Sequence, residues 1–332
     1  MKLYDFPGIG KLAATIFLAT ATIFSYAAAL DAQTPPATVG VLTPGLHYEP
    51  VFDGLREGLE KLGYRENREV KFLVEDTKGS LDTLAKRAAK LVGARPDVLF
   101  TVATASAVAA KQATEAIPMV FTVVGDPVRS GLVAAFGSSR NNLTGVSSFA
   151  AQLSGKRLDL LKEIAPQAKK VLAVVPIKEA SGRISFEYLE EGAKKLSLQI
   201  VRRDVTTSDE MGNLLKEKWA DTVDAVFNVP SVLVVSLMEL IVEKAKKERL
   251  PLISFEQTHV QMGALASYAG GFRESGIQAA KLVFKILRGA KPSDLPIEIP
   301  DRLILSVNLT TAKAIGLKIP RTVLDRADRL VE

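Results

Sequence analysis

The chain has 332 residues, which is too long for one ordinary domain and sufficient for two. Hydrophobic residues make up 47% of it and charged residues 24%, as in a globular protein with buried cores. Cysteine is absent, which excludes disulfides, thiolate nucleophiles and zinc–cysteine sites, so no lipid-anchored form is expected either. The formal net charge is +6, but the basic residues are scattered among acidic ones and indicate solvated helix faces, so no nucleic-acid partner is expected.

Residues 1–32 are predicted to be a signal peptide. After a modestly basic start, Leu12–Leu30 is an uncharged run of mostly apolar and small residues. The alternative is a membrane anchor, because the run approaches the roughly 20 residues that span a bilayer. Its Ala/Thr-rich composition and its small-residue end favour cleavage, after Ala29 or after Ala32. The sequence therefore predicts an exported, periplasmic protein.

Beyond residue 37, short apolar segments alternate with segments of helical periodicity. The expected strands are Thr38–Leu42, Val70–Val74, Asp97–Val102, Pro118–Val124, Thr144–Phe149, Val171–Val175, Leu198–Arg202, Asp224–Val229, Pro251–Phe255, Ala264–Tyr268 and Leu303–Val307. The expected helices are Phe52–Leu62, Leu81–Leu91 capped by Ser80, Ser106–Glu115, Leu132–Phe136, a helix capped by Ser154 that runs to Ile164, Ser185–Leu196, Asp209–Lys216, Val232–Lys247, Glu274–Leu287, Thr310–Ile315 and Thr322–Leu330. Such alternation implies parallel sheets with helices on both faces, and two such series imply two similar lobes.

Motifs for catalysis, metals and nucleotides are missing. The two histidines, His47 and His259, are isolated and lack metal-site spacing. There is no Walker A motif, no G-x-G-x-x-G after the first strand and no G-x-S-x-G elbow. We therefore expect no catalytic residue, no metal and no cofactor. One enzymatic alternative is kept open, a hydrolase or isomerase that uses Asp126 and Glu256.

Three loops follow strand ends, where open α/β sheets bind ligands. They begin at Thr43, Thr104 and Gly125. The Ser106 hydroxyl and backbone N–H groups at a helix start favour a carboxylate, and capping the helix is compatible with that role. Asp126 either faces an ammonium group or fixes its own turn. A small zwitterion is the ligand that this chemistry suits.

An ordered set of motifs runs through nearly all of the chain after the leader. The set comprises Phe52–Leu59, Ala109–Thr114, Gly125–Val128, Gly131–Val133, Asn142–Ser147, Lys156–Leu158, Ile286–Pro292, Asp294–Pro296, Asn308–Leu317, Ile319–Pro320 and Arg326–Asp328. With these motifs the sequence resembles the tryptophan/tyrosine-type substrate-binding proteins of ABC transporters.

The resemblance implies a type I periplasmic binding fold, an α/β fold of two Rossmann-like lobes with parallel sheets flanked by helices and joined by three hinge crossings. Lobe 1 would comprise 37–147 and 271–300, and lobe 2 would comprise 148–270 and 301–332. The implied function is that of a periplasmic receptor for an ABC importer, which captures a small molecule between the lobes. The implied partners are a permease and an ATPase in the inner membrane, and the receptor itself is expected to be a monomer.

The resemblance also indicates where a ligand would bind. In the first lobe the family's ligand loops correspond to Thr43, Thr104, Ala105, Ser106, Asp126 and Ser147, with Tyr268 beside the hinge. Candidates in the second lobe are Ser231, Phe255 and Glu256, although Phe255 fits a core position equally well.

Pro176–Ser181 lacks the asparagine that many relatives carry after this strand. This difference bears on the ligand, for which an amino acid or a related aromatic or carboxylate compound is the leading hypothesis. The alternative function is an exported ligand-sensing adaptor for a membrane signalling protein, because the same fold would serve.

Overall fold

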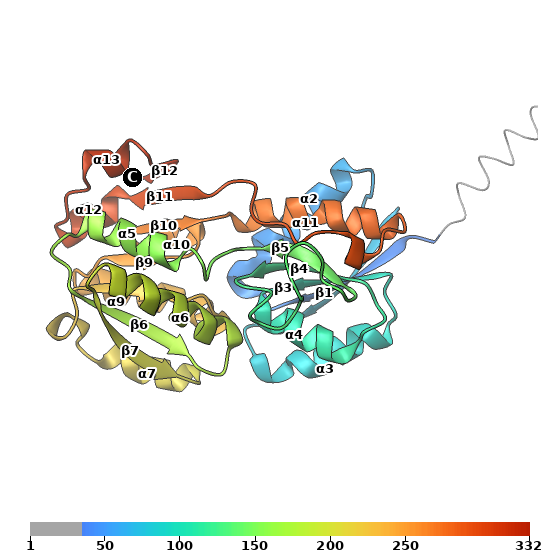
Figure 1. Ribbon diagram of the computed structural model, residues 1–332, viewed down its shortest axis with the longest axis horizontal. Helices are drawn as coiled ribbons and strands as arrows, with labels where there is room; N and C mark the ends of the chain where they lie inside the picture. The colour runs from blue at the N-terminus through green and yellow to red at the C-terminus, as the bar shows by residue number, and fades with distance from the viewer. Residues whose placement is uncertain (1–34) are drawn as a thin grey trace, which may run out of the picture. The chain divides into compact units, whose positions relative to one another are not determined.

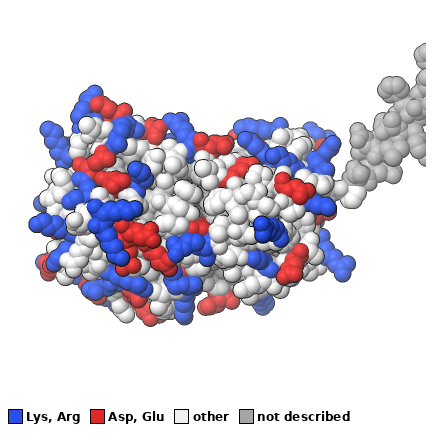
Figure 2. All heavy atoms as spheres, in the orientation of Figure 1, with Lys and Arg blue, Asp and Glu red and all other residues white. Residues whose placement is uncertain are grey.

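The computed structural model describes residues 35–332, so the predicted signal peptide at 1–32 lies outside the described residues. No helix within 35–332 is long and apolar enough to cross a membrane. Two sheets with helices on their faces make up this part of the chain (Figure 1). Figure 2 shows basic and acidic side chains interspersed over the visible face, in agreement with the scattered charges of the sequence.

The N-terminal sheet is wholly parallel and has the strand order β2-β1-β3-β4-β5. Its strands are β1 (Ala37–Thr43), β2 (Val70–Asp76), β3 (Val98–Val102), β4 (Met119–Val124) and β5 (Leu143–Ser147). Helices α3 (Leu84–Gly93) and α4 (Thr104–Ala113) share one buried cluster with this sheet, and α2 (Glu49–Lys61) and α11 (Phe272–Leu287) share another. The two clusters take alternate residues of the strands, such as Phe100 and Leu99, because successive side chains point to opposite faces.

Close packing of α2 against α11 attaches a late segment of the chain to the N-terminal sheet. A Cβ on Gly54 would lie 2.1 Å from the Arg273 carbonyl oxygen, and one on Gly276 would lie 2.0 Å from the Val51 carbonyl oxygen. Only glycine permits this backbone approach. Helix α11 therefore belongs with α2, although it follows a strand of the other sheet.

The C-terminal sheet has the strand order β12-β11-β10-β9-β8-β6-β7. Its strands are β6 (Lys170–Pro176), β7 (Gln199–Val205), β8 (Ala225–Asn228), β9 (Leu252–Ser254), β10 (Ala266–Ala269), β11 (Ile304–Asn308) and β12 (Arg329–Val331). Its helices are α5 (Ser154–Ile164), α6 (Ala180–Lys195), α7 (Ser208–Lys216), α8 (Val232–Ser236), α9 (Met238–Lys247), α10 (Gln257–Met262), α12 (Leu309–Ile315) and α13 (Arg321–Leu324). Only the β10–β11 pair of this sheet is antiparallel, because the chain leaves for α11 after β10 and returns from the opposite direction.

We call the N-terminal sheet with α2, α3, α4 and α11 lobe 1, and the C-terminal sheet with its helices lobe 2. The chain passes between them three times, at residues 148–153, 270–271 and 288–303 (Figure 1). Two mostly parallel sheets flanked by helices confirm the predicted fold class.

Two predicted helices are wrong. Leu132–Phe136 is irregular, because the N–H groups of Leu132 and Val133 both donate to the Pro127 carbonyl and form a compact loop instead. The predicted helix Thr322–Leu330 ends at Leu324. The chain then forms β12, which pairs with β11, and this long-range pairing overrides the local helical pattern.

Several helix ends also differ from the prediction. The single helix expected over Val232–Lys247 is divided at Leu237, whose φ of −118° and ψ of 15° interrupt the helical backbone between α8 and α9. Ser154 is the first helical residue of α5 and not its cap, and its hydroxyl accepts a bond from Arg157 instead. Ser80 precedes a short 3-10 turn without making a side-chain cap. The short helix α10 has no counterpart among the predicted elements.

Candidate ligand-binding site

A cavity lies between the lobes, at the carboxyl ends of strands from both sheets. Lobe 1 lines it with Tyr48, with the segment that joins β3 to α4, and with the end of β4. Lobe 2 contributes the segments that follow β8 and β9, and two of the chain crossings complete the wall. The cavity measures about 30 Å³, room for one or two water molecules, whereas small-molecule pockets typically exceed roughly 300 Å³. The lobes are therefore closed on one another, and side chains of the cavity wall must shift to make room for a larger ligand.

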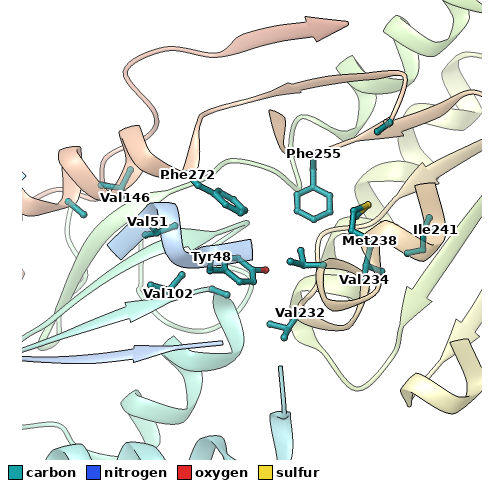
Figure 3. Close-up of a cluster of buried hydrophobic side chains, with 14 of the residues drawn as sticks. Tyr48, Val51, Val102, Val146, Val232, Val234, Met238, Ile241, Phe255 and Phe272 are labelled. Carbon is teal, nitrogen blue, oxygen red and sulfur yellow. The ribbon is translucent and has the colours of Figure 1, made fainter. Parts of the chain in front are cut away.

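Three aromatic rings meet at the cavity (Figure 3). Tyr48, from the turn after β1, stacks on Phe272 at the start of α11, with ring centroids 5.2 Å apart. Phe255 faces them from lobe 2, directly after β9. All three side chains are buried and belong to one hydrophobic cluster that continues from lobe 1 into lobe 2. The cavity therefore offers flat apolar surfaces from both lobes.

The amino end of α4 opens into the same cavity. Its N-cap, Ala103, makes no side-chain cap bond, and Thr104 and Ala105 line the cavity. Within residues 35–332 no acceptor is found for the backbone N–H groups of Thr104 and Ala105. Helix N-termini attract anions, because the N–H groups point outward and carry the positive end of the helix dipole. This end of the cavity suits a carboxylate.

Backbone strain marks the same region. Ala103 has φ of 70° and Val123 has φ of 56°, although only glycine enters this part of φ/ψ space readily. Both residues line the cavity, at the carboxyl ends of neighbouring strands. Strain of this kind costs about 1–3 kcal/mol per residue and gathers at ligand sites, where it fixes backbone groups in position.

On the lobe 2 side of the cavity, side chains accept hydrogen bonds from the backbone N–H groups at the start of α8. Ser231 caps α8 by accepting a bond of 3.0 Å from the Val234 N–H. The Glu179 carboxylate accepts bonds from the Val232 and Leu233 N–H groups at 2.8 and 3.0 Å. These amides are satisfied within lobe 2, so the α8 end offers no comparable anion site.

Two carboxyl groups are buried on the lobe 2 side, and burial favours their protonated, neutral form. Burial raises the pKa of Glu179, although its two backbone bonds oppose the shift. Burial also raises the pKa of Glu256 to about 8. Burial raises the pKa of the Tyr48 hydroxyl as well, and the negative charges of Glu179 and Glu256 add to this effect. In Figure 3 the Tyr48 hydroxyl points toward lobe 2, between the two lobes. Tyr48 is therefore a neutral phenol, whose oxygen can accept a hydrogen bond from a ligand.

Four of the residues predicted from sequence come together at the cavity, namely Thr104, Ala105, Ser231 and Phe255. The other six, described next, lie outside its lining. Thr43 accepts a bond from the Gly45 N–H and shapes the loop after β1. Ser147 donates to the Val124 carbonyl and accepts from the Phe149 N–H, so it holds the first crossing. Ser106 does not open α4, which starts at Thr104; it is fully buried in the first turn.

The remaining three predicted residues have other surroundings. Asp126 accepts bonds from the Val128 and Arg129 N–H groups, so the turn-fixing role foreseen for it is present. Glu256 caps α10 by accepting a bond from the Thr258 N–H. Tyr268 lines a separate groove on lobe 2, beside α5.

Sequence reasoning missed Tyr48 and Phe272. Both follow strand ends, which is the signal that identified the other loops, since Tyr48 comes after β1 and Phe272 after β10. Neither residue belongs to the motifs or to the predicted ligand contacts. Their stacking joins positions that are far apart in sequence, so it depends on the docking of α11 against α2.

Two mostly parallel lobes, joined by three crossings and with a cavity at their strand ends, define the type I periplasmic binding fold. The chain belongs to the ABC transporter substrate binding protein family, whose model matches residues 39–331. It is therefore a substrate-binding protein and not an enzyme, and the enzymatic alternative with Asp126 and Glu256 is set aside.

Known proteins resemble the chain over most of its length. A tyrosine-binding protein of Clostridioides difficile (strain R20291) is 28% identical over 265 residues, which cover 80% of this chain and 76% of that protein. A conserved domain protein from Vibrio cholerae is 29% identical, with a TM-score of 0.84 over 89% of this chain and 100% of the other.

Two further solved structures share the fold. An ABC domain from Streptococcus pneumonia in complex with L-Trp is 24% identical, with a TM-score of 0.84 over 90% of this chain and 100% of the other. A ligand-free, open substrate-binding protein with adhesive properties from Clostridium difficile is 27% identical, with a TM-score of 0.65 over 89% of this chain and 99% of the other.

Proposed function

We propose that this protein is the periplasmic receptor of an ABC importer and that it binds a zwitterionic amino acid with an aromatic side chain. The observation that carries the proposal is the uncapped end of α4 beside three aromatic rings in one cavity. A permease and an ATPase would receive the ligand. The signal peptide would be cleaved between residues 29 and 33, and the released receptor would act as a monomer.

The ligand's carboxylate would accept bonds from the Thr104 and Ala105 N–H groups at the helix end. Its ammonium group would lie toward the Tyr48 hydroxyl, whose oxygen can accept a hydrogen bond from it. Its aromatic ring would pack among Tyr48, Phe272 and Phe255. Each of the three ligand groups thus has a matching region of the wall.

Binding would be accompanied by closure of the lobes, because only the closed form contacts a ligand from both sides. The moving units would be 37–147 with 271–300 and 148–270 with 301–332. The TM-score of 0.84 to the L-Trp complex, against 0.65 to the open ligand-free protein, supports a closed arrangement in this chain.

The names of the relatives support the ligand class. The relative from Clostridioides difficile is called a tyrosine-binding protein, and the structure from Streptococcus pneumonia contains L-Trp. The segment Pro176–Ser181 lacks the asparagine that many relatives carry. Ligand release is therefore measured for both L-tryptophan and L-tyrosine.

Calorimetric titration with three matched compounds tests the proposal. L-tryptophan should bind with about micromolar affinity, as transport receptors require, or about 8 kcal/mol. Indole-3-propionate lacks the ammonium group and tryptamine lacks the carboxylate. Each should bind about 10- to 100-fold more weakly, because one charge-assisted bond is lost. Equal affinity for all three would refute the zwitterion site. Co-purification of an unrelated molecule, identified by native mass spectrometry, would refute the ligand class.

A further inference from the structure

Asp126 joins the two lobes at a point outside the cavity lining. Its Oδ1 accepts bonds from the Val128 and Arg129 N–H groups at 3.1 and 2.9 Å, which fixes the turn after β4. Its Oδ2 accepts a bond of 3.0 Å from the hydroxyl of Tyr188, which lies on α6 in lobe 2. Asp126 is only 5% exposed, so water competes weakly for this interlobe bond.

Arg129 makes a second contact across the same gap. Its guanidinium pairs with the Glu187 carboxylate and lies over the Tyr188 ring, with Cζ 5.0 Å from the ring centroid. The two lobes thus meet with complementary groups, a carboxylate and a guanidinium on lobe 1 facing a phenol and a carboxylate on lobe 2. We call Asp126, Arg129, Glu187 and Tyr188 the interlobe clasp.

The interlobe clasp joins the turn after β4 in lobe 1 to α6 in lobe 2. In Figure 1 the three crossings run above the level of α4 and α6, and α4 packs against α6 between the lobes. Opening of the lobes must therefore break the bonds to α6, whereas the turn at Asp126 holds its shape through its own backbone bonds.

The geometry points to the interlobe clasp as a device that stabilises the closed state and so sets how long a ligand stays bound. This inference rests on the proposed function for its ligand, but the closed state itself can be measured without one. Since the interlobe clasp does not line the cavity, it changes the equilibrium between open and closed forms equally for every ligand. Weakening it lowers affinity by raising the dissociation rate and leaves the order of ligand preference unchanged.

Tyr188→Phe removes the hydroxyl that bonds Asp126 and retains the ring under Arg129. We expect the equilibrium constant for closing to fall about tenfold, because the loss of one hydrogen bond to a charged group changes an equilibrium constant by about that factor. Glu187→Gln weakens an exposed ion pair and should have an effect of about twofold. Tyr64→Phe is the matched control, because Tyr64 packs on Phe284 within lobe 1. Glu191→Gln is the exposed control on α6.

The chain contains no cysteine, so two labels can be introduced at unique sites. Lys86→Cys on lobe 1 and Lys195→Cys on α6 are exposed positions for a donor and an acceptor dye. Energy transfer is measured without ligand and across a titration with L-tryptophan. The dissociation rates of L-tryptophan and L-tyrosine are measured by stopped flow.

Tyr188→Phe should shift the transfer distribution toward the open state at each L-tryptophan concentration and should speed the release of both amino acids by the same factor. The two controls should match the wild type. An unchanged distribution both with and without L-tryptophan overturns the inference, as does a change in the preference between the two ligands. If wild type ignores both amino acids while Tyr188→Phe still opens the ligand-free protein, the proposed ligand fails and the interlobe clasp stands.

Discussion

On the lobe 1 side of the cavity, α4 begins at Ala103 without a side-chain cap. On the lobe 2 side, α8 and α10 begin at Ser231 and Glu256, and each is capped by its own side chain. Glu179 satisfies two further amides of α8. One lobe thus leaves a positive helix end for a ligand, and the other meets its own hydrogen-bonding needs and adds buried carboxyl groups. Two similar folds thus differ in whether their helix N-termini leave backbone N–H groups free for a ligand.

The largest expected effect concerns Glu256, whose pKa is raised to about 8 by burial. An acid with a raised pKa in the folded state contributes stability that is fully present below its ordinary pKa, near 4.5, and is lost as pH rises through 8. The free energy of unfolding of wild type should fall by a few kcal/mol more than that of Glu256→Gln between pH 5 and pH 8. Urea unfolding at both pH values measures this difference. Parallel pH profiles would show that Glu256 is not held protonated in the folded protein.

Glu179→Ala tests how much the two bonds from Glu179 to the α8 amides stabilise the fold. The substitution leaves the buried Val232 N–H and the Leu233 N–H without their acceptor, and each orphaned donor costs about 1–3 kcal/mol. Urea unfolding at pH 7 should show a loss of about 2–4 kcal/mol. Glu191→Gln, on the exposed face of α6, is the control and should stay within about 0.5 kcal/mol of wild type. A loss no greater than the control's would mean that water replaces the carboxylate.

Substitutions at the starts of α8 and α4 should change the free energy of unfolding in opposite directions. Ser231→Ala removes a cap bond and should cost about 1 kcal/mol of unfolding free energy. Ala103→Gly relieves the strain at φ of 70° and should add about 0.5–2 kcal/mol, after the greater flexibility of glycine in the unfolded chain is subtracted. Thermal unfolding of both variants measures the two effects. Destabilisation by Ala103→Gly would contradict the assignment of strain to this position.

Much of the fold was predictable from local pattern. Most strands and many helices lie close to where periodicity placed them, because apolar spacing reflects which face of an element is buried. The failures occurred where distant contacts decide the local structure. The final segment forms β12 because β11 lies beside it, and the Leu132 loop curls around the Pro127 carbonyl. Neither partner is visible in a local window of sequence.

The candidate site was predictable in its position and less so in its members. Parallel strands carry their ligand loops at one edge, which predicts Thr104 and Ala105, and the family resemblance adds Ser231 and Phe255; all four line the cavity. The same rule says nothing about which side chain of a loop faces the partner lobe. Asp126 has the chemistry of an ammonium ligand, yet its carboxylate is bonded to its own turn and to Tyr188.

The sequence by itself determined the alternation of strands and helices, the two parallel lobes and the edge at which a ligand would bind. These follow from periodicity and from the geometry of parallel sheets, which act locally. Only the tertiary structure decided that Tyr48 stacks on Phe272, that Glu179 caps the amides of α8 and that Tyr188 bonds Asp126. Each of these contacts joins residues that are far apart in the chain. They depend on how whole elements pack, and that packing reflects the combined burial and close approach of many side chains at once.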